Sequence, residues 1–510
     1  MRFMIRTASH WASVGDLWSQ PPSRPPAASP LRLRAYGSLQ GMVRVNRRAL
    51  AVWLVLFGVY AATVGARAFD HSAYAGDEPR FLLSARSLAH DGDVNVFDDY
   101  RSNAYRGFYM HKLSSAGVPN RVHRTLYEPG GLGFPLLLAP AYMAGGSHAV
   151  EFFLAALAAL AVALAYLLAL RVVPDPWALG AALAVGISPP LLAYSTTVYP
   201  ELAAGALLAG AALLGLEAAE RPTRPRVFGC FMLLALVPWM SVRLAPAGLA
   251  IAVYVIARLR RQRHGLMALM GAEVAGFSAA LFVAVNEGFY GGITPYAGLP
   301  AGTSATGASA FGDYAHRTSR LAGLFLDRDV GLLRWAPVLL LGFVGVWLLW
   351  RGHRERLAHA VPSYRRMAAA AGVCAAAVGA QLVVAAFVAP AIAGPWFPGR
   401  QLIAVLPLSI PLVAWGLRHL PRLGSALAAI TGAASLWLYL DVRFGSGGLA
   451  AGRPDAPWGP LVKAFPNFNG SAYPTSVAIA AGVLILLLFL RDGRRWRRLA
   501  ALGWPAAAKR

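Results

Sequence analysis

The chain has 510 residues, of which 57% are hydrophobic and only 14% charged, and its 47 Lys and Arg against 23 Asp and Glu give a formal net charge of +24. Soluble domains average about 25% charged residues, so this composition excludes a cytosolic enzyme and predicts a membrane protein. Such a basic excess suggests nucleic-acid binding in a soluble protein, whereas a membrane protein accumulates Arg in its cytoplasmic segments.

The N-terminal residues 1–47 carry scattered Arg and a Pro-rich stretch, which predicts a disordered basic cytoplasmic tail. Met42, followed closely by Arg47 and Arg48, is an equally good start, so residues 1–41 need not belong to the mature protein. We interpret the first apolar run, 49–66, as a retained membrane span, with a cleaved signal peptide as the alternative.

A polar segment, 69–130, follows the first run and holds eight acidic and seven basic residues. Beyond it the chain is a series of apolar runs, interrupted by a Gly-, Ala-, Ser- and Thr-rich loop at 287–332. A helix needs about 20 apolar residues to cross a bilayer. The runs after residue 130 are 131–145, 149–170, 177–196, 201–219, 227–241, 243–258, 266–286, 333–350, 367–389, 401–417, 423–440 and 475–490.

Arg is concentrated in a few connections, which account for the whole positive excess and leave the rest of the chain close to neutral. Because cytoplasmic segments are enriched in Arg, this pattern is a topology signal and leaves no basic surface for nucleic acid. If the N-terminus is cytoplasmic, the first span leaves the chain outside, whereas Arg258 should lie inside, so an odd number of crossings must separate them. Six apolar runs lie between them, so one of these runs cannot cross fully. The short run 131–145, which contains Pro135 and Pro140, is the best candidate for a half-helix at the outer side.

These observations predict an all-α polytopic membrane protein with about 11–12 transmembrane helices. We divide it into the tail 1–47, a transmembrane module 48–440 that includes the external loops 69–130 and 287–332, and a C-terminal part 441–510. That last part holds an external loop, the final transmembrane helix and a basic cytoplasmic end.

The first external loop opens with Gly76-Asp77-Glu78-Pro79-Arg80, and Phe81, Ala85 and Leu88 follow at helical spacing. This pattern predicts an amphipathic helix on the membrane surface. Asp77 is either an N-cap, with Glu78 and Pro79 in the first turn, or part of an acidic pair available as a general base.

Several short motifs follow one another in order between residues 75 and 415. They are Gly76-Asp77-Glu78-Pro79-Arg80-Phe81, Ala85-Arg86-Ser87-Leu88, Asp91-Gly92-Asp93, Glu128-Pro129 running into Gly131-Leu132-Gly133-Phe134-Pro135, Tyr199-Pro200-Glu201, and the segments 328–337 and 396–402. These motifs resemble those of GT-C membrane glycosyltransferases, a group that includes the lipid A aminoarabinose transferases and the protein O-mannosyltransferases. Two positions depart from the pattern: Pro129 replaces the Lys of the aminoarabinose transferases, and no Asp precedes Glu201.

The resemblance implies a GT-C type bundle that moves a sugar from a polyprenyl-phosphate donor to a hydroxyl of a cell-envelope acceptor, with inversion, at the outer face. A hydroxyl is a weak nucleophile, so a carboxylate must take its proton, and Asp77 is our first choice. Glu78 and Glu201 are the accompanying catalytic candidates. The departing lipid phosphate needs cations, and the chosen ones are Arg80, Arg124, Arg243 and Arg400.

Glu128, Tyr127 and Tyr296 are assigned to substrate binding, although aromatic residues at these places are also typical of a membrane interface. We expect no protein-bound metal site and no certain cofactor, with a divalent cation as the open alternative. The acidic residues of 91–99 have suitable oxygen chemistry, but their spacing matches no EF-hand.

The rival interpretations are a transporter or lipid flippase, and an inactive scaffold within a cell-wall assembly. Transporters tend to carry internal repeats and charges near the bilayer midplane, and neither is evident here. Only the enzyme hypothesis requires Asp77 and Glu201 to meet in one outward-facing pocket. Its expected partners are the lipid-linked donor, the envelope acceptor and membrane lipids. It predicts a multi-pass inner (plasma) membrane protein whose termini are cytoplasmic and whose active site is periplasmic or extracellular.

Overall fold

The computed structural model describes residues 47–69, 72–300, 302–303, 306–308, 311–353, 362–445, 447–449, 465–466 and 468. The predicted tail before residue 47 and the predicted last span, 475–490, lie outside these residues. The described ranges are helical, with only two isolated β-bridges. The helices of the bundle are α1 (Arg47–Ala61), α4 (Gly133–Leu170), α5 (Trp177–Gly186), α6 (Pro189–Tyr194), α7 (Glu201–Glu220), α8 (Arg224–Met240), α9 (Ala245–Arg261), α10 (Gly265–Tyr290), α14 (Leu340–His353), α15 (Pro362–Val383), α16 (Leu406–His419) and α17 (Pro421–Phe444).

The remaining helices are short and belong to the connecting loops. They are α2 (Glu78–His90) and α3 (Phe97–Ser102) in the first loop, α11 (Phe311–His316), α12 (Arg320–Leu326) and α13 (Leu332–Trp335) in the second, and single turns such as η4 (Val242–Leu244), η5 (Pro295–Gly298) and η10 (Arg400–Val405).

Seven of the described helical segments are long and apolar enough to cross a membrane. The predicted all-α, multi-pass architecture is therefore confirmed. They are Gly133–Leu170, Glu201–Glu220, Val242–Arg261, Gly265–Gly298, Tyr364–Val388, Arg400–His419 and Pro421–Phe444.

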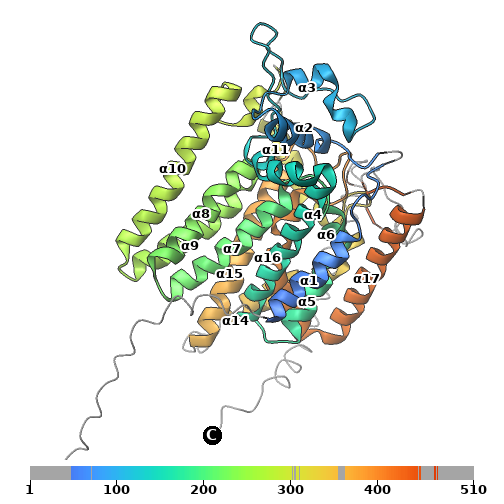
Figure 1. Cartoon of the computed structure of the whole chain (residues 1–510). Coiled ribbons are helices and arrows are strands. Elements are labelled where there is room, and N and C mark those ends of the chain that lie inside the picture. The colour runs from blue at the N-terminus through green and yellow to red at the C-terminus, as the bar shows by residue number, and fades with distance from the viewer. Residues whose placement is uncertain are drawn as a thin grey trace, which may run out of the picture. The chain divides into compact units, whose positions relative to one another are not determined.

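Helices α7 and α16 form the centre of the bundle, and α10 and α17 lie at its flanks (Figure 1). The most hydrophobic window is 78% buried in α7 and 83% buried in the segment containing α16, but only 17% in the α10 segment and 28% in α17. Small residues permit the central packing. A Cβ at Gly205 of α7 would lie 2.9 Å from the carbonyl oxygen of Ala404, and one at Gly215 would lie 2.7 Å from Val255.

Helix α4 is one element with a kink, at the place where the sequence separates two apolar runs. Gly145 and Gly146 have non-helical backbone angles, with φ of +66° at Gly146. Its 38 residues correspond to about 57 Å of helix, well beyond a bilayer core of about 30 Å. The part before the kink packs under the first external loop, where Phe134 makes an edge contact with Phe81 at 5.2 Å between ring centroids.

The basic connections gather at one end of the bundle. Arg171, which follows α4, pairs with Glu220 at the end of α7 at 2.9 Å, and Arg48 of α1 pairs with Asp175 at 2.6 Å. Glu201 begins α7, whose 20 residues span about 30 Å. Glu201 is therefore about one bilayer thickness away from the end where Arg171 lies.

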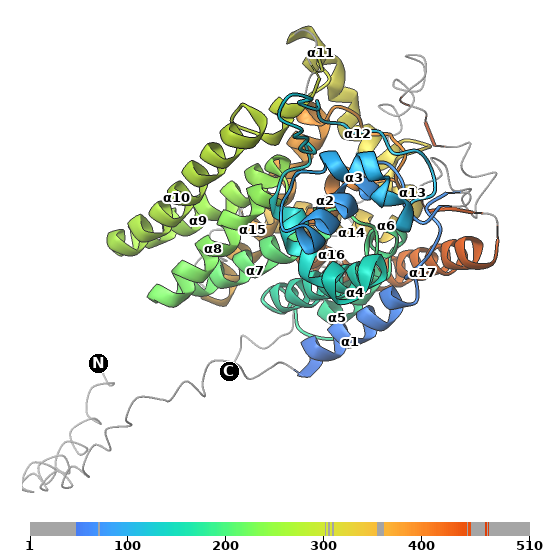
Figure 2. The same ribbon diagram turned by 45° about the horizontal axis from the view of Figure 1, so that its top comes forward.

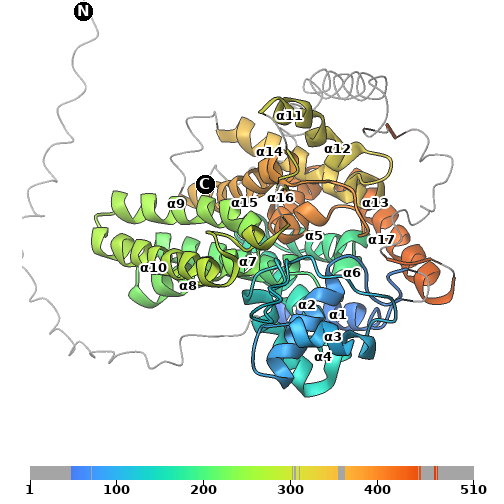
Figure 3. The same ribbon diagram turned by 90° about the horizontal axis from the view of Figure 1, so that it is seen from above.

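The loop 69–130, which the sequence predicts to be external, caps the other end of the bundle, as α2 and α3 show in Figures 2 and 3. The predicted amphipathic helix is α2, and Phe81 and Ala85 are buried against the bundle as the spacing indicates. Its opposite face is covered as well, because Leu83 packs with Val96 and other apolar residues of the same loop. Helix α2 is thus held between the bundle and its own loop.

Candidate active site

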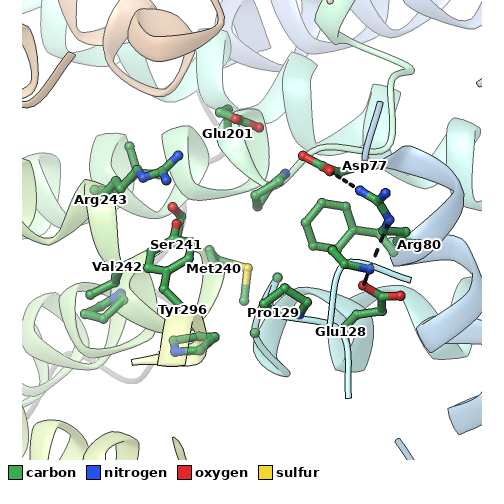
Figure 4. A pocket seen from close by; sticks show the side chains of 18 of the residues that line it. Asp77, Arg80, Glu128, Pro129, Glu201, Met240, Ser241, Val242, Arg243 and Tyr296 are labelled. Carbon is green, nitrogen blue, oxygen red and sulfur yellow. Dashed lines mark hydrogen bonds and ion pairs between the residues drawn. The ribbon is translucent and has the colours of Figure 1, made fainter. Parts of the chain in front are cut away.

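A cavity of about 350 Å³ lies between the first external loop and the loop after α10 (Figure 4). Both predicted loops contribute, and Val118 of the first donates a backbone hydrogen bond to Gly298 of the second at 3.3 Å. The ionisable and polar residues that line it are Asp77, Arg80, Glu128, Glu201, Ser241, Arg243, Tyr296, Thr303, Gln381, Trp396, Arg400 and Gln401.

The turn before α2 carries Asp77 into the cavity. Gly76 has φ of +59°, and a Cβ there would lie 2.7 Å from the hydroxyl of Tyr199. That hydroxyl donates to the carbonyl of Ala75 at 3.1 Å. The motif around Asp77 is thus packed directly on the motif that ends in Glu201, and only glycine fits at position 76.

Asp77 occupies the N-cap position of α2, but its side chain makes no capping hydrogen bond. One oxygen, Oδ1, accepts from Arg80 at 2.7 Å, and Oδ2 lies 3.7 Å from a guanidinium nitrogen of Arg400. The Asp77 side chain keeps 47% of its surface exposed. Asp77 therefore does not cap α2 through its side chain, and its carboxylate faces two arginines.

Arg400 connects the two acidic motifs. Its Nε donates to Oε1 of Glu201 at 2.9 Å, while its other arm faces Asp77. The guanidinium carbon lies 3.8 Å from the ring centroid of Tyr199 and 4.8 Å from that of Trp396. Two aromatic faces and two carboxylates therefore hold one cation in a single orientation.

Glu128 lies beside Arg80 on the same side of the cavity (Figure 4). Its carboxylate accepts from the Tyr100 hydroxyl at 2.5 Å and from the Ala116 amide at 3.2 Å, and Arg80 Nε is 4.0 Å away. Burial raises the pKa of Glu128, although these donors and Arg80 favour its charged form. Glu128 therefore anchors the loop and supports Arg80.

Arg243 lies across the cavity from Arg80 (Figure 4). It belongs to η4, the break between α8 and α9, and its guanidinium carbon lies 4.7 Å from the ring centroid of Tyr296. The cavity thus holds three arginines, Arg80, Arg243 and Arg400, and three carboxylates, Asp77, Glu128 and Glu201.

Glu78 is buried behind the cavity and does not line it. Its two carboxylate oxygens accept from the backbone amides of Ala75 at 3.2 Å and Val198 at 2.9 Å. Burial raises the pKa of Glu78 to about 8. Glu78 joins the Asp77 turn to the segment before α7. It therefore helps to position Asp77 and does not itself face the cavity.

Two further residues selected from the sequence lie outside the cavity lining. Arg124 is an exposed residue with φ of +52° near the tip of the first loop. Tyr127 packs edge-on against Phe289 at 5.0 Å and Tyr290 at 6.4 Å between ring centroids. Within the described ranges no group of three or more His, Cys, Asp or Glu side chains is placed to hold a metal ion.

Gln381 is a cavity residue that the sequence did not single out. It lies in the apolar run 367–389, and its side-chain amide donates to the carbonyl of Gln401 at 3.0 Å. The sequence did contain a signal for Gln381, because it is a polar residue inside a predicted membrane span. Burying such a group in a membrane is unfavourable, so polar residues within spans often mark functional sites.

Comparison with known proteins gives matches at the level of structure. No protein-family profile matches the chain, and no curated protein matches it. ArnT from Cupriavidus metallidurans bound to undecaprenyl phosphate is similar at 15% identity with a TM-score of 0.46, over 89% of this chain and 72% of that chain. The apo oligosaccharyltransferase of Archaeoglobus fulgidus is similar at 14% identity with a TM-score of 0.42, over 81% of this chain and 57% of that chain. Both are GT-C glycosyltransferases, the group that the loop motifs of this sequence resemble.

Proposed function

We propose that this protein is a membrane glycosyltransferase that moves a sugar from a polyprenyl-phosphate donor to a hydroxyl of a cell-envelope acceptor at the outer face. The observation that carries the proposal is the sharing of Arg400 by Asp77 and Glu201 in one cavity. Positive residues enriched at the opposite end favour a cytoplasmic position for that end, and hence an outer position for the cavity.

The proposed reaction is a single displacement. The acceptor oxygen forms a bond to the anomeric carbon of the donor, the bond from that carbon to the phosphate oxygen breaks, and the acceptor proton passes to Asp77. The polyprenyl phosphate leaves with both electrons of the broken bond, and the configuration at the anomeric carbon inverts. Asp77 is suited to this role because its carboxylate is partly exposed and held by Arg80.

The arginines of the cavity supply the charge that the leaving phosphate requires. Arg243 approaches from the side opposite Arg80 (Figure 4), so a phosphate between them would contact cations on two sides. Arginine suits this task because its guanidinium can bind phosphate with two parallel hydrogen bonds. Glu201 accepts a hydrogen bond from Nε of Arg400. A terminal nitrogen of the same guanidinium is then directed at Asp77 and the cavity.

A transporter or flippase is the second candidate, and the placement of charge argues against it. A transport pathway would need polar groups near the middle of the bundle, whereas the acidic motifs lie at one end of α7 and the Arg171–Glu220 pair at the other.

The test is transfer by purified protein with a panel of polyprenyl-phosphate sugars and envelope acceptors. Asp77→Asn keeps the size of the side chain but cannot accept the proton, so we expect transfer to fall by about 100-fold or more, as for loss of a general base. Asp98→Asn is the matched control, because Asp98 is an exposed acid of the same loop outside the cavity. Asp77→Asn protein that folds normally and retains full activity would contradict the proposal.

A further inference from the structure

One wall of the cavity contains three buried polar atoms that have no hydrogen-bond partner among the described residues: Oε2 of Glu201, Oε1 of Gln381 and Nε1 of Trp396. All three side chains line the cavity. A buried polar group without a partner destabilises the protein, because it has lost its hydrogen bonds to water and gained none in exchange. Three such groups around one cavity indicate that a ligand satisfies them.

The three side chains are held in place by their other contacts. Oε1 of Glu201 is paired with Arg400 at 2.9 Å. The amide nitrogen of Gln381 donates to the carbonyl oxygen of Gln401, the residue that follows Arg400. The Trp396 ring lies over the Arg400 guanidinium. The ring also packs so closely on Gly394 that a Cβ there would lie 2.2 Å from it. The unpartnered atoms are thus held around Arg400 by these contacts.

We propose that Glu201, Gln381 and Trp396 form the subsite for the sugar of the donor, and that this subsite selects a neutral, hydroxyl-bearing sugar over a cationic amino sugar. This inference rests on the proposed function. The wall offers two acceptors, on Glu201 and Gln381, and one donor, the indole N–H of Trp396. Neighbouring sugar hydroxyls can serve all three, because each hydroxyl both donates and accepts.

An amino sugar fits this wall poorly. An ammonium group only donates, so where it takes the place of the hydroxyl that faces Trp396 it leaves the indole N–H without an acceptor. The charge of Glu201 is already matched by Arg400, whose guanidinium lies against Trp396 and repels a second cation. A neutral sugar avoids both costs.

The experiment measures the affinity of the full-length protein in detergent for four kinds of lipid: undecaprenyl phosphate alone, the same lipid carrying a neutral hexose (glucose, mannose and galactose in parallel), one carrying a neutral pentose, and one carrying an amino sugar. We expect at least one neutral donor to bind about fivefold or more tightly than the bare lipid, as one or more satisfied buried hydrogen bonds would give. The amino-sugar donor should show no such gain.

Trp396→Phe removes the N–H and keeps an aromatic ring beside Arg400. It should abolish the gain in affinity of the neutral-sugar lipid over undecaprenyl phosphate, with both lipids measured on the same variant. Gln381→Leu should do the same. Trp415→Phe is the matched control, since Trp415 also has an unpartnered buried Nε1 but packs against His419 in α16 and does not line the cavity.

The outcomes separate the two proposals. If the bare lipid binds but no neutral sugar adds affinity, if the gain survives in both variants, or if the amino sugar binds more tightly, the subsite is wrong while the proposed function stands. If none of the lipids binds, the proposed function itself is wrong.

Discussion

Arg400 is the residue on which the site depends most. It touches Asp77 and Glu201, which come from distant parts of the chain, and it lies between the rings of Tyr199 and Trp396. From the sequence, Arg400 was one of several candidate arginines. A cation between two apolar runs is expected to pair with an anion, but the sequence does not indicate which one. The pairing of residues 77, 201 and 400 is a product of tertiary packing.

Glu78 shows how burial changes a role that the sequence left open. Next to Asp77 it was a second candidate base, but its two oxygens are occupied by backbone amides. No pattern in a single sequence distinguishes an exposed acid from a buried one at adjacent positions of a turn.

The raised pKa of Glu78 predicts a pH-dependent stability. Because the pKa is about 8 in the folded protein and about 4.3 in an unfolded chain, folding favours the protonated form. This contribution is fully present below about pH 4.3 and is lost as the pH rises through about 8. Glu78→Gln cannot titrate, so its melting temperature in detergent should fall less steeply over this range than that of the wild type.

The control for that comparison is Asp98→Asn, which removes an exposed carboxylate of the same loop. Its melting temperature should follow the wild-type dependence on pH. Equal slopes for wild type and Glu78→Gln would show that Glu78 does not titrate as its burial requires.

At the scale of elements, breaks in the apolar pattern were the most reliable guide. The sequence separates 131–145 from 149–170, and the α4 kink lies at Gly145 and Gly146 between them. It separates 227–241 from 243–258, and α8 and α9 meet there at η4. Pro, Gly and Arg interrupt helices for local reasons, so their effects are visible without tertiary information. The burial of both faces of α2 was not visible, because it depends on how the rest of the first loop folds over the helix.

The turn before α2, within the first loop, provides a test at this scale. Gly76→Ala introduces a Cβ 2.7 Å from the Tyr199 hydroxyl at a φ of +59°, so it should displace Asp77 and reduce transfer by about tenfold or more, because a small misplacement at the reacting centre is costly. Gly92→Ala is the control: φ there is +75°, but nothing lies within 4 Å of the added Cβ.

Both substitutions should lower stability by about 1 kcal/mol through backbone strain, and only Gly76→Ala should impair transfer. Equal transfer rates in the two variants would mean that the contact between Gly76 and Tyr199 does not position Asp77. The quantities to measure are the melting temperature and the initial rate at saturating donor.

At the scale of the whole molecule, charge predicted more than hydrophobic periodicity did. The confinement of Arg to a few connections anticipated two chemically different ends, one with Arg48, Arg171 and their acidic partners and one with the cavity. The enzyme hypothesis required Asp77 and Glu201 to meet in one pocket, and both residues line the cavity. The particular residues on its wall, Gln381 above all, came only from the packing of α15 against η10 and the neighbouring loop.

This arrangement predicts the labelling of single cysteines in intact cells. Cys230 and Cys374 are both free and buried, so they should not react with a membrane-impermeant maleimide. Val122→Cys, at the exposed tip of the first loop, should be labelled from outside. Arg261→Cys, at the exposed end of α9, should be labelled only after the membrane is opened. The reverse pattern would put the cavity on the cytoplasmic side.

The central claim is that the cavity between the two external loops is where the lipid-linked sugar reacts. The most direct measurement is a structure, by electron cryo-microscopy, of the Asp77→Asn protein with a polyprenyl-phosphate sugar that it binds. We predict that the phosphate contacts at least one of Arg80, Arg243 and Arg400, with the sugar between residue 77 and Trp396. A donor bound elsewhere on the protein, with the cavity free of its phosphate, would contradict the account.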